Sequence, residues 1–127
     1  MLPRILSGLV GLFFFAQAAN FLLSPEAGAA ALGMPLLDGI ARSTQVGDIS
    51  GVFLTIALLC GLGIARQSPH GPRAAGILLA TIAVSRILAW LVSGAAFAAV
   101  PIGVEFVTAG LLFFAAARFE AGSNAPD

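Results

Sequence analysis

The chain has 127 residues, of which 59% are hydrophobic and 9% are charged, and its formal net charge is zero. Its mean hydropathy of +1.02 lies well above that of soluble domains, and the balanced charge excludes a strongly basic nucleic-acid binder. We therefore expect an integral membrane protein without a nucleic-acid partner, in which residues 1–127 form one domain.

Four apolar segments predict four membrane-spanning helices. A helix rises about 1.5 Å per residue, so each segment is long enough, or nearly so, to cross about 30 Å of hydrocarbon. Short connections join them, and only residues 121–127 form a polar tail. The sequence therefore predicts an all-α fold, an up-down bundle of four transmembrane helices with spans at residues 5–23, 40–66, 74–93 and 100–118.

The first span has an alternative interpretation. Arg4, the apolar run and the small-residue triplet Ala16-Gln17-Ala18 also fit a secretory signal that is cleaved after residue 18. The apolar run resumes at residues 21–23 and reaches full spanning length, which favours a transmembrane helix. Cleavage of residues 1–18 remains the open alternative.

The longest connection, residues 24–47, carries helix signals of its own. Ser24, Pro25 and Glu26 match an N-cap, a first-turn proline and a first-turn carboxylate, and Gly33 is a stop signal. We expect a short surface helix here, between the first and second spans. Asp38 can cap the next helix, which then begins near residue 39.

The arginines predict the orientation, because the chain contains no lysine. With a cytoplasmic amino terminus, Arg4, Arg66, Arg73 and Arg118 all lie on the cytoplasmic side and only Arg42 lies outside. We therefore expect both termini in the cytoplasm, with the surface helix outside.

Arg86 lies in an otherwise apolar stretch, residues 74–104. A charged side chain at membrane depth costs at least about 2.5 kcal/mol, so this position requires a counter-ion or a function. Asp48 and Glu105 are the two acids expected within the hydrocarbon, and all three residues lie in the outer halves of their helices. We predict that Arg86, Asp48 and Glu105 meet in a polar pocket in the outer half of the bundle.

Further polar side chains lie at a similar depth to these three residues or on the same helix faces. Gln17 and Asn20, like Glu105 and Thr108, are three residues apart and so lie on one helix face. The additional candidate ligand-binding residues are Gln17, Asn20, Thr55, Trp90 and Thr108. Gly47 and Gly51 form a small-residue pattern that favours close helix packing, within the chain or between two copies.

No metal or cofactor is expected. Cys60 is a single cysteine in an apolar helix and is expected to be a packing residue, and His70 has no second metal ligand near it in the sequence. No phosphate-binding loop, zinc signature or nucleophile elbow is present.

The order of these elements resembles a known family, DUF4345, which comprises small bacterial membrane proteins with four predicted helices and no established activity. The segments that carry the resemblance are Leu23-Ser24-Pro25, Leu32-Gly33, Arg42 ahead of Gly47-Asp48, Ser85-Arg86-Ile87-Leu88 with Gly94, and Glu105. The resemblance implies the four-helix layout, gives weight to Arg86 and Glu105, and implies a bacterial inner membrane protein. It implies no function.

Several functions fit this pattern. The first is a protein that binds a lipid or lipophilic small molecule in the polar pocket, with homo-oligomerisation possible. The second is an enzyme with hydrolase- or isomerase-type chemistry on a terpenoid, steroid or epoxide. In it Asp48 and Glu105 act as acid and base, and Arg86 and Asn20 orient a water or polarise an oxygen. The third is a small multidrug-type exporter. A purely structural ion pair that sets helix register is the non-functional alternative.

Overall fold

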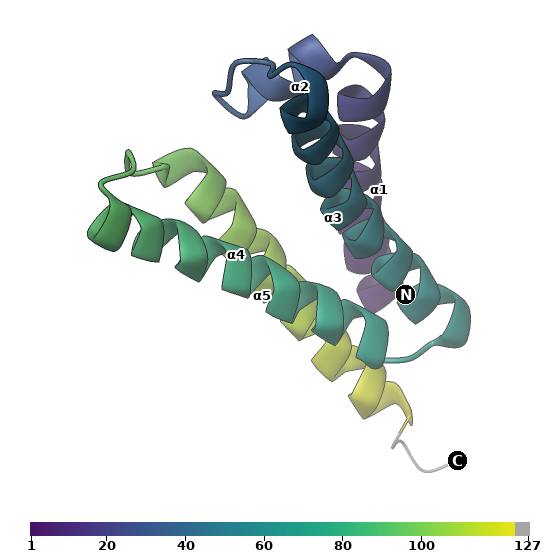
Figure 1. Ribbon diagram of the computed structural model, residues 1–127. Coiled ribbons are helices and arrows are strands. Elements are labelled where there is room, and N and C mark those ends of the chain that lie inside the picture. Colours follow the sequence, from purple (N-terminus) through teal and green to yellow (C-terminus); the bar gives the residue numbers. More distant parts are fainter. Residues whose placement is uncertain (124–127) are drawn as a thin grey trace.

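The computed structural model describes residues 1–123, and this range is all-helical, as predicted. Four of its helices are long and apolar enough to cross a membrane, and they alternate in direction (Figure 1). The elements are α1 (Leu2–Leu23), α2 (Pro25–Ala31), α3 (Gly39–Arg66), α4 (His70–Ser93) and α5 (Ala99–Ser123). The up-down order of the four long helices confirms the predicted fold class and fits a multi-pass membrane protein.

The ends of the helices refine the predicted limits. The short helix α2 lies between the first two spans, as expected. Helix α5 continues to Ser123, so the first residues of the expected polar tail are helical, and residues 124–127 lie outside the described range. Ser24 and Asp38 occupy the predicted N-cap positions, but neither side chain bonds to a helix N–H group. The Asp38 carboxylate instead pairs with Arg42, at 3.0 Å.

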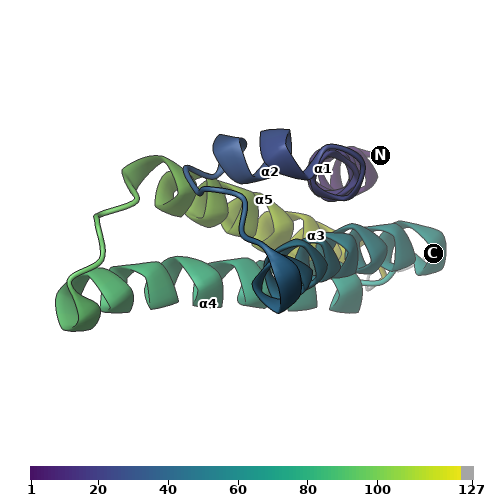
Figure 2. The ribbon, with the colours of Figure 1, turned by 45° about the horizontal axis from the view of Figure 1, so that its top comes forward.

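The four long helices form two pairs that diverge in a V rather than one closed bundle. Helix α1 packs along α3 and α4 packs along α5, and the pairs meet at the α3–α4 turn and separate toward α2 (Figure 1). In Figure 2, α1 is seen almost end-on while α4 runs across the view, which shows how far the two pairs differ in direction. We refer to the open side of the V as the α2 end.

Glycines hold the two pairs together at the closed end of the V. A Cβ atom added to Gly71 would overlap the carbonyl oxygen of Leu59 and would lie 3.0 Å from the backbone nitrogen of Gly63. A Cβ atom on Gly63 would in turn overlap the ring of Pro72. The backbones of α3 and α4 therefore touch at this point, which side chains on either glycine would prevent.

Above this joint, all four long helices contribute to one apolar core. Its largest members include Phe14 from α1, Ile56 from α3, Leu79 from α4 and Leu112 from α5, each almost completely buried. The core lies in the middle of the molecule and ends where the two pairs separate.

The outer surface of the helices is strongly apolar. Soluble proteins rarely expose large continuous apolar patches, whereas a lipid-facing surface consists of them. Exposed apolar side chains occur on all four long helices and include Leu9, Leu12, Leu58, Ile77, Leu91, Val107 and Phe114. This surface fits a lipid environment around the long helices.

The other helical glycines differ in whether they make close contacts within the described chain. A Cβ atom on Gly11 would lie 3.0 Å from Cys60, so this glycine does bring α1 close to α3. By contrast, no atom lies within 4 Å of a Cβ atom added to Gly47, Gly51 or Gly110. The Gly47–Gly51 pattern therefore makes no close helix contact within the described chain.

A buried glutamine, Gln45, forms hydrogen bonds with the link between α2 and α3. The Gln45 side chain accepts a hydrogen bond from the Leu37 backbone N–H at 3.0 Å and donates one to the Pro35 carbonyl at 2.9 Å. Its amide nitrogen also lies 4.0 Å from the sulfur of Met34. Gln45 thus fixes residues 32–38 over the α2 end of α3.

Candidate functional site

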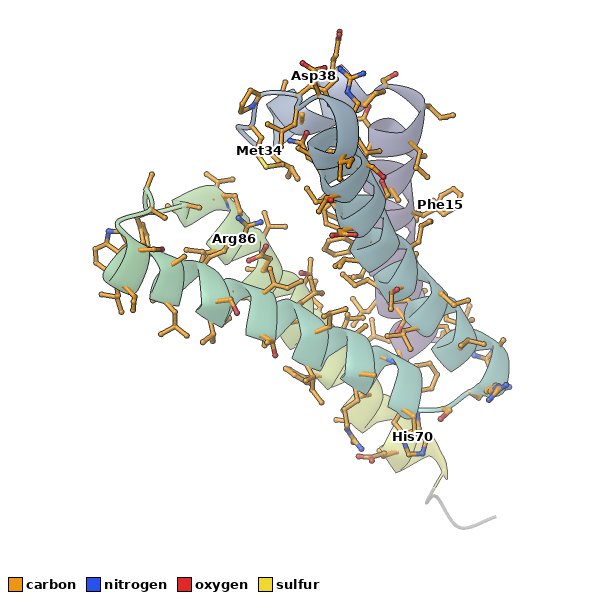
Figure 3. All side chains as sticks on the ribbon, viewed as in Figure 1. Phe15, Met34, Asp38, His70 and Arg86 are labelled. Atoms are coloured by element: carbon orange, nitrogen blue, oxygen red, sulfur yellow. The ribbon has the colours of Figure 1, made fainter. Side chains whose placement is uncertain are left out.

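A cleft of about 330 Å³ lies between the two helix pairs on the open side of the V. In Figure 3, Met34 extends from the α2–α3 link on one side of this space, and Arg86 lies on the other side. The lining comes from every long helix and from the link, and consists of Phe14, Leu32, Met34, Asp48, Ile49, Val52, Phe53, Leu79, Ile82, Arg86 and Glu105. We call this space the cleft.

An ion pair between α4 and α5 lies on one wall of the cleft. The Arg86 Nε donates a hydrogen bond to Oε1 of Glu105 at 2.8 Å. Glu105 comes from the second turn of α5, and the antiparallel packing of α4 and α5 brings it level with Arg86. Of the two expected counter-ions, Glu105 is therefore the one that pairs with Arg86.

The two partners differ in burial. The Glu105 side chain is 10% exposed and the Arg86 side chain is 37% exposed. The second carboxylate oxygen of Glu105, Oε2, is fully buried and has no hydrogen-bond partner among the described residues. Unpartnered buried polar atoms are rare because each loses its hydration without compensation. Glu105, which lines the cleft, thus has one hydrogen-bonding atom that no described residue uses.

Asp48 also lines the cleft, from the α3 side, so the three ionisable residues predicted to meet do share one space. Asp48 is exposed and forms no ion pair with any residue in the described range, in contrast to Glu105. The divergence of the two helix pairs separates α3 from α4 at this depth (Figure 1). The cleft therefore carries one paired acid, one unpaired acid and one arginine.

The remaining walls of the cleft are apolar and partly aromatic. The rings of Phe14 and Phe53 lie 5.4 Å apart between centroids, tilted by 49°. Ile49, Val52 and Ile82 supply aliphatic surface. An apolar cavity with a few fixed polar groups is typical of a small-molecule site, and its volume lies near the lower end of the usual range of about 300–1,000 Å³.

The additional residues predicted for ligand binding do not line the cleft. Gln17 and Asn20 are partly buried on α1, outside its lining. The Thr55 and Thr108 hydroxyls donate to carbonyls of their own helices, Gly51 at 2.8 Å and Val104 at 2.7 Å. Trp90 is exposed near the end of α4, where its ring lies 5.2 Å from that of Phe97.

Thr55 lines a second groove instead, of about 860 Å³, between α1 and α3. Its walls are almost entirely apolar and contain Gly8, Gly11 and Gly61, with no ionisable side chain except the Cys60 thiol. Its polar groups are the hydroxyls of Ser7 and Thr55 and the Cys60 thiol. Unlike the cleft, it contains no charged side chain that would attract the polar group of a ligand.

Sequence reasoning missed Phe14, Met34 and Gln45. The first two line the cleft, and Gln45 is hydrogen-bonded to the link that carries Met34. No periodic signal in the sequence distinguishes Phe14 from its neighbours Phe13 and Phe15. Gln45 had a usable signal, because it is a neutral polar residue one turn after Arg42 on the helix that carries Asp48.

Charged side chains also lie at the end of the molecule opposite the α2 end. Arg73 Nη2 lies 2.6 Å from Oε1 of Glu120. This ion pair connects the first turn of α4 to the end of α5. His70 lies at this end, far from the cleft (Figure 3). Within residues 1–123, no group of three His, Cys, Asp or Glu side chains is placed to hold a metal ion.

Comparisons with protein-family models, with curated proteins and with solved structures found no match to this chain.

Proposed function

We propose that this protein binds a lipid or lipophilic small molecule in the cleft, with the polar group of the ligand at Arg86, Glu105 and Asp48. The observation that carries the proposal is that three ionisable residues from three different helices line one space whose other walls are apolar. Ionisable groups at membrane depth are costly, and their convergence in one cavity is typical of a binding site.

The geometry favours binding over a purely structural ion pair. A pair that only fixed helix register would be enclosed, with its hydrogen-bonding capacity used, because unmet capacity is costly. Here the Arg86 side chain is 37% exposed and Glu105 Oε2 has no partner among the described residues. A ligand with hydrogen-bonding groups would supply what the pair lacks.

The proposal includes a location. We place the protein in the bacterial inner membrane with both termini in the cytoplasm, as the arginine distribution and the resemblance to the DUF4345 family imply. The α2 end, and with it the cleft, then faces the outer leaflet. A lipophilic ligand can reach such a site from the lipid phase without crossing the cytoplasmic half of the bundle.

A mass spectrum of the intact protein, sprayed from detergent after purification, tests the proposal. We expect a bound lipophile on the wild-type protein. The bound mass should disappear when the cleft is filled by Ile49→Trp, because Ile49 lines the cleft. It should remain with Leu58→Trp, a matched change on the same helix that fills the second groove.

Either of two results would contradict the proposal. One is a wild-type protein that carries no lipophile even after membrane lipids are added back. The other is a bound mass that survives Ile49→Trp or that is lost equally with Leu58→Trp. Circular dichroism of both variants should show the wild-type helix content.

An enzyme is the second candidate, and the observation that favours it is the placement of Asp48 across the cleft from Glu105, whose Oε2 atom is unpartnered. Two carboxyl groups in different surroundings can divide acid and base roles. The same spectra separate the two candidates. An added compound that leaves the protein with its mass and its chromatographic retention unchanged indicates binding, whereas hydrolysis would alter its mass and isomerisation would alter its retention.

A further inference from the structure

We infer that the ligand of the cleft is a lipophilic amine, a hydrocarbon body that carries a protonated amino group. This inference rests on the proposed function, since it names the ligand class of the same cleft. It runs against the simplest expectation from Arg86, which is that the cleft holds an acidic lipid. Three features of the cleft lining favour a cation.

The first feature is the charge of the cleft. Arg86 and Glu105 neutralise each other across 2.8 Å, so their combined field falls off quickly with distance. Asp48 adds a negative charge that no described residue pairs with. The side chains that line the cleft therefore carry a formal net charge of −1. A monovalent cation would neutralise this charge, whereas a monovalent anion would raise the total to −2.

The second feature is the hydrogen-bonding capacity that remains. Glu105 is 8% exposed, lines the cleft, and its Oε2 atom is an acceptor without a donor in the described chain. An ammonium group has three N–H donors and no acceptor, so it can serve Oε2 and the Asp48 carboxylate together. A ligand carboxylate has only acceptors and would leave Oε2 unpartnered.

The third feature is the apolar surface beside these acids. Phe14 and Phe53 form an aromatic pair in the lining, and the face of an aromatic ring attracts a cation. Met34 adds a polarisable thioether from the α2–α3 link. A carboxylate gains nothing from the ring faces, whereas an ammonium group and its hydrocarbon body are both stabilised.

Three probes with the same chain length test the inference: decylamine, decanol and decanoate. Each is radiolabelled and equilibrated with protein in nanodiscs of phosphatidylcholine, and uptake by discs without protein is subtracted. Binding to the cleft is defined as the part that Ile49→Trp abolishes. We expect decylamine to bind at least about tenfold tighter than decanol, because a charge-assisted hydrogen bond supplies a free-energy difference of this size. Decanoate should bind most weakly of the three probes.

Matched acid variants identify the groups responsible. Asp48→Asn should weaken decylamine binding about tenfold and should weaken decanol binding much less, because it removes a charge that attracts an ammonium group more strongly than a hydroxyl group. Asp38→Asn makes the same chemical change outside the cleft, at an exposed acid that pairs with Arg42, and should affect neither probe.

The outcomes separate this inference from the function on which it rests. Cleft binding in which decanol or decanoate equals decylamine overturns the amine assignment and leaves the proposed function standing. An equal effect of Asp48→Asn and Asp38→Asn also overturns it. If none of the three probes binds to the cleft, the amine assignment falls, and the bound mass in the intact-protein spectra decides the proposed function separately.

Discussion

Replacing Gly71 with alanine should loosen the joint on which the whole V depends. The added Cβ atom would overlap the Leu59 carbonyl oxygen and press on the backbone of Gly63. All of these atoms belong to helix backbones, so no side-chain rotation relieves the contact. Overpacking of this kind costs about 1–3 kcal/mol. For a chain of this size, we expect an unfolding midpoint lower by about 4–12 °C.

Gly110→Ala is the matched control, because Gly110 lies within α5 and no atom is found within 4 Å of its added Cβ. Alanine there should be neutral or stabilise α5 by about 0.5–1 kcal/mol, since it restricts the backbone more than glycine does. The two variants should therefore differ by about 1–4 kcal/mol in stability.

The chain supplies its own reporter for this measurement. Cys60 is the only cysteine and is 1% exposed, so a thiol-reactive fluorogenic dye reacts as the protein unfolds on heating. A Gly71→Ala protein that melts within about 2 °C of both wild type and Gly110→Ala would refute the reasoning. It would mean that α3 and α4 separate at this point without cost.

Two further predictions follow from the link and from the orientation. Gln45→Ala removes the acceptor of the Leu37 N–H, so the rate of hydrogen exchange at the Leu37 amide should rise. The protein should also lose about 1–2 kcal/mol of stability. An unchanged exchange rate would contradict the role of Gln45. In a Cys60→Ala background, a membrane-impermeant maleimide added to intact cells should label Ser24→Cys but label His70→Cys only after permeabilisation. The reverse pattern would invert the proposed topology.

The fold class was predictable because it depends on composition over long segments. Each apolar run is long enough to cross a bilayer and is bounded by arginine or by proline and glycine, so α1, α3, α4 and α5 follow from length alone. The pairing of Arg86 with an acid was predictable for a related reason. Ionisable residues are so few in these segments that Arg86 had only two possible partners, Asp48 and Glu105. The choice of Glu105 was not predictable, because the helices that carry the two acids, α3 and α5, are both antiparallel to α4.

The shape of the bundle was not predictable, because it depends on contacts between backbones. Nothing in the local sequence distinguishes Gly63, which touches Pro72 of α4, from Gly51 on the same helix, which faces open space. Asp48 and Thr55 were both predicted as residues of one binding site. Helix α3 instead packs mainly on α1, so Asp48 lines the cleft while Thr55 lines the second groove. Periodicity identifies a helix face but does not identify its neighbour.

The divergence of the two helix pairs also affects the surrounding bilayer. A molecule that is narrow at the α3–α4 turn and broad at the α2 end displaces unequal areas of lipid from the two leaflets when it spans the membrane (Figure 1). Lipids beside the broad end must tilt or be replaced by others of different shape, whereas those beside the narrow end need not. The protein is therefore a wedge, and its stability should depend on the curvature of the membrane that contains it.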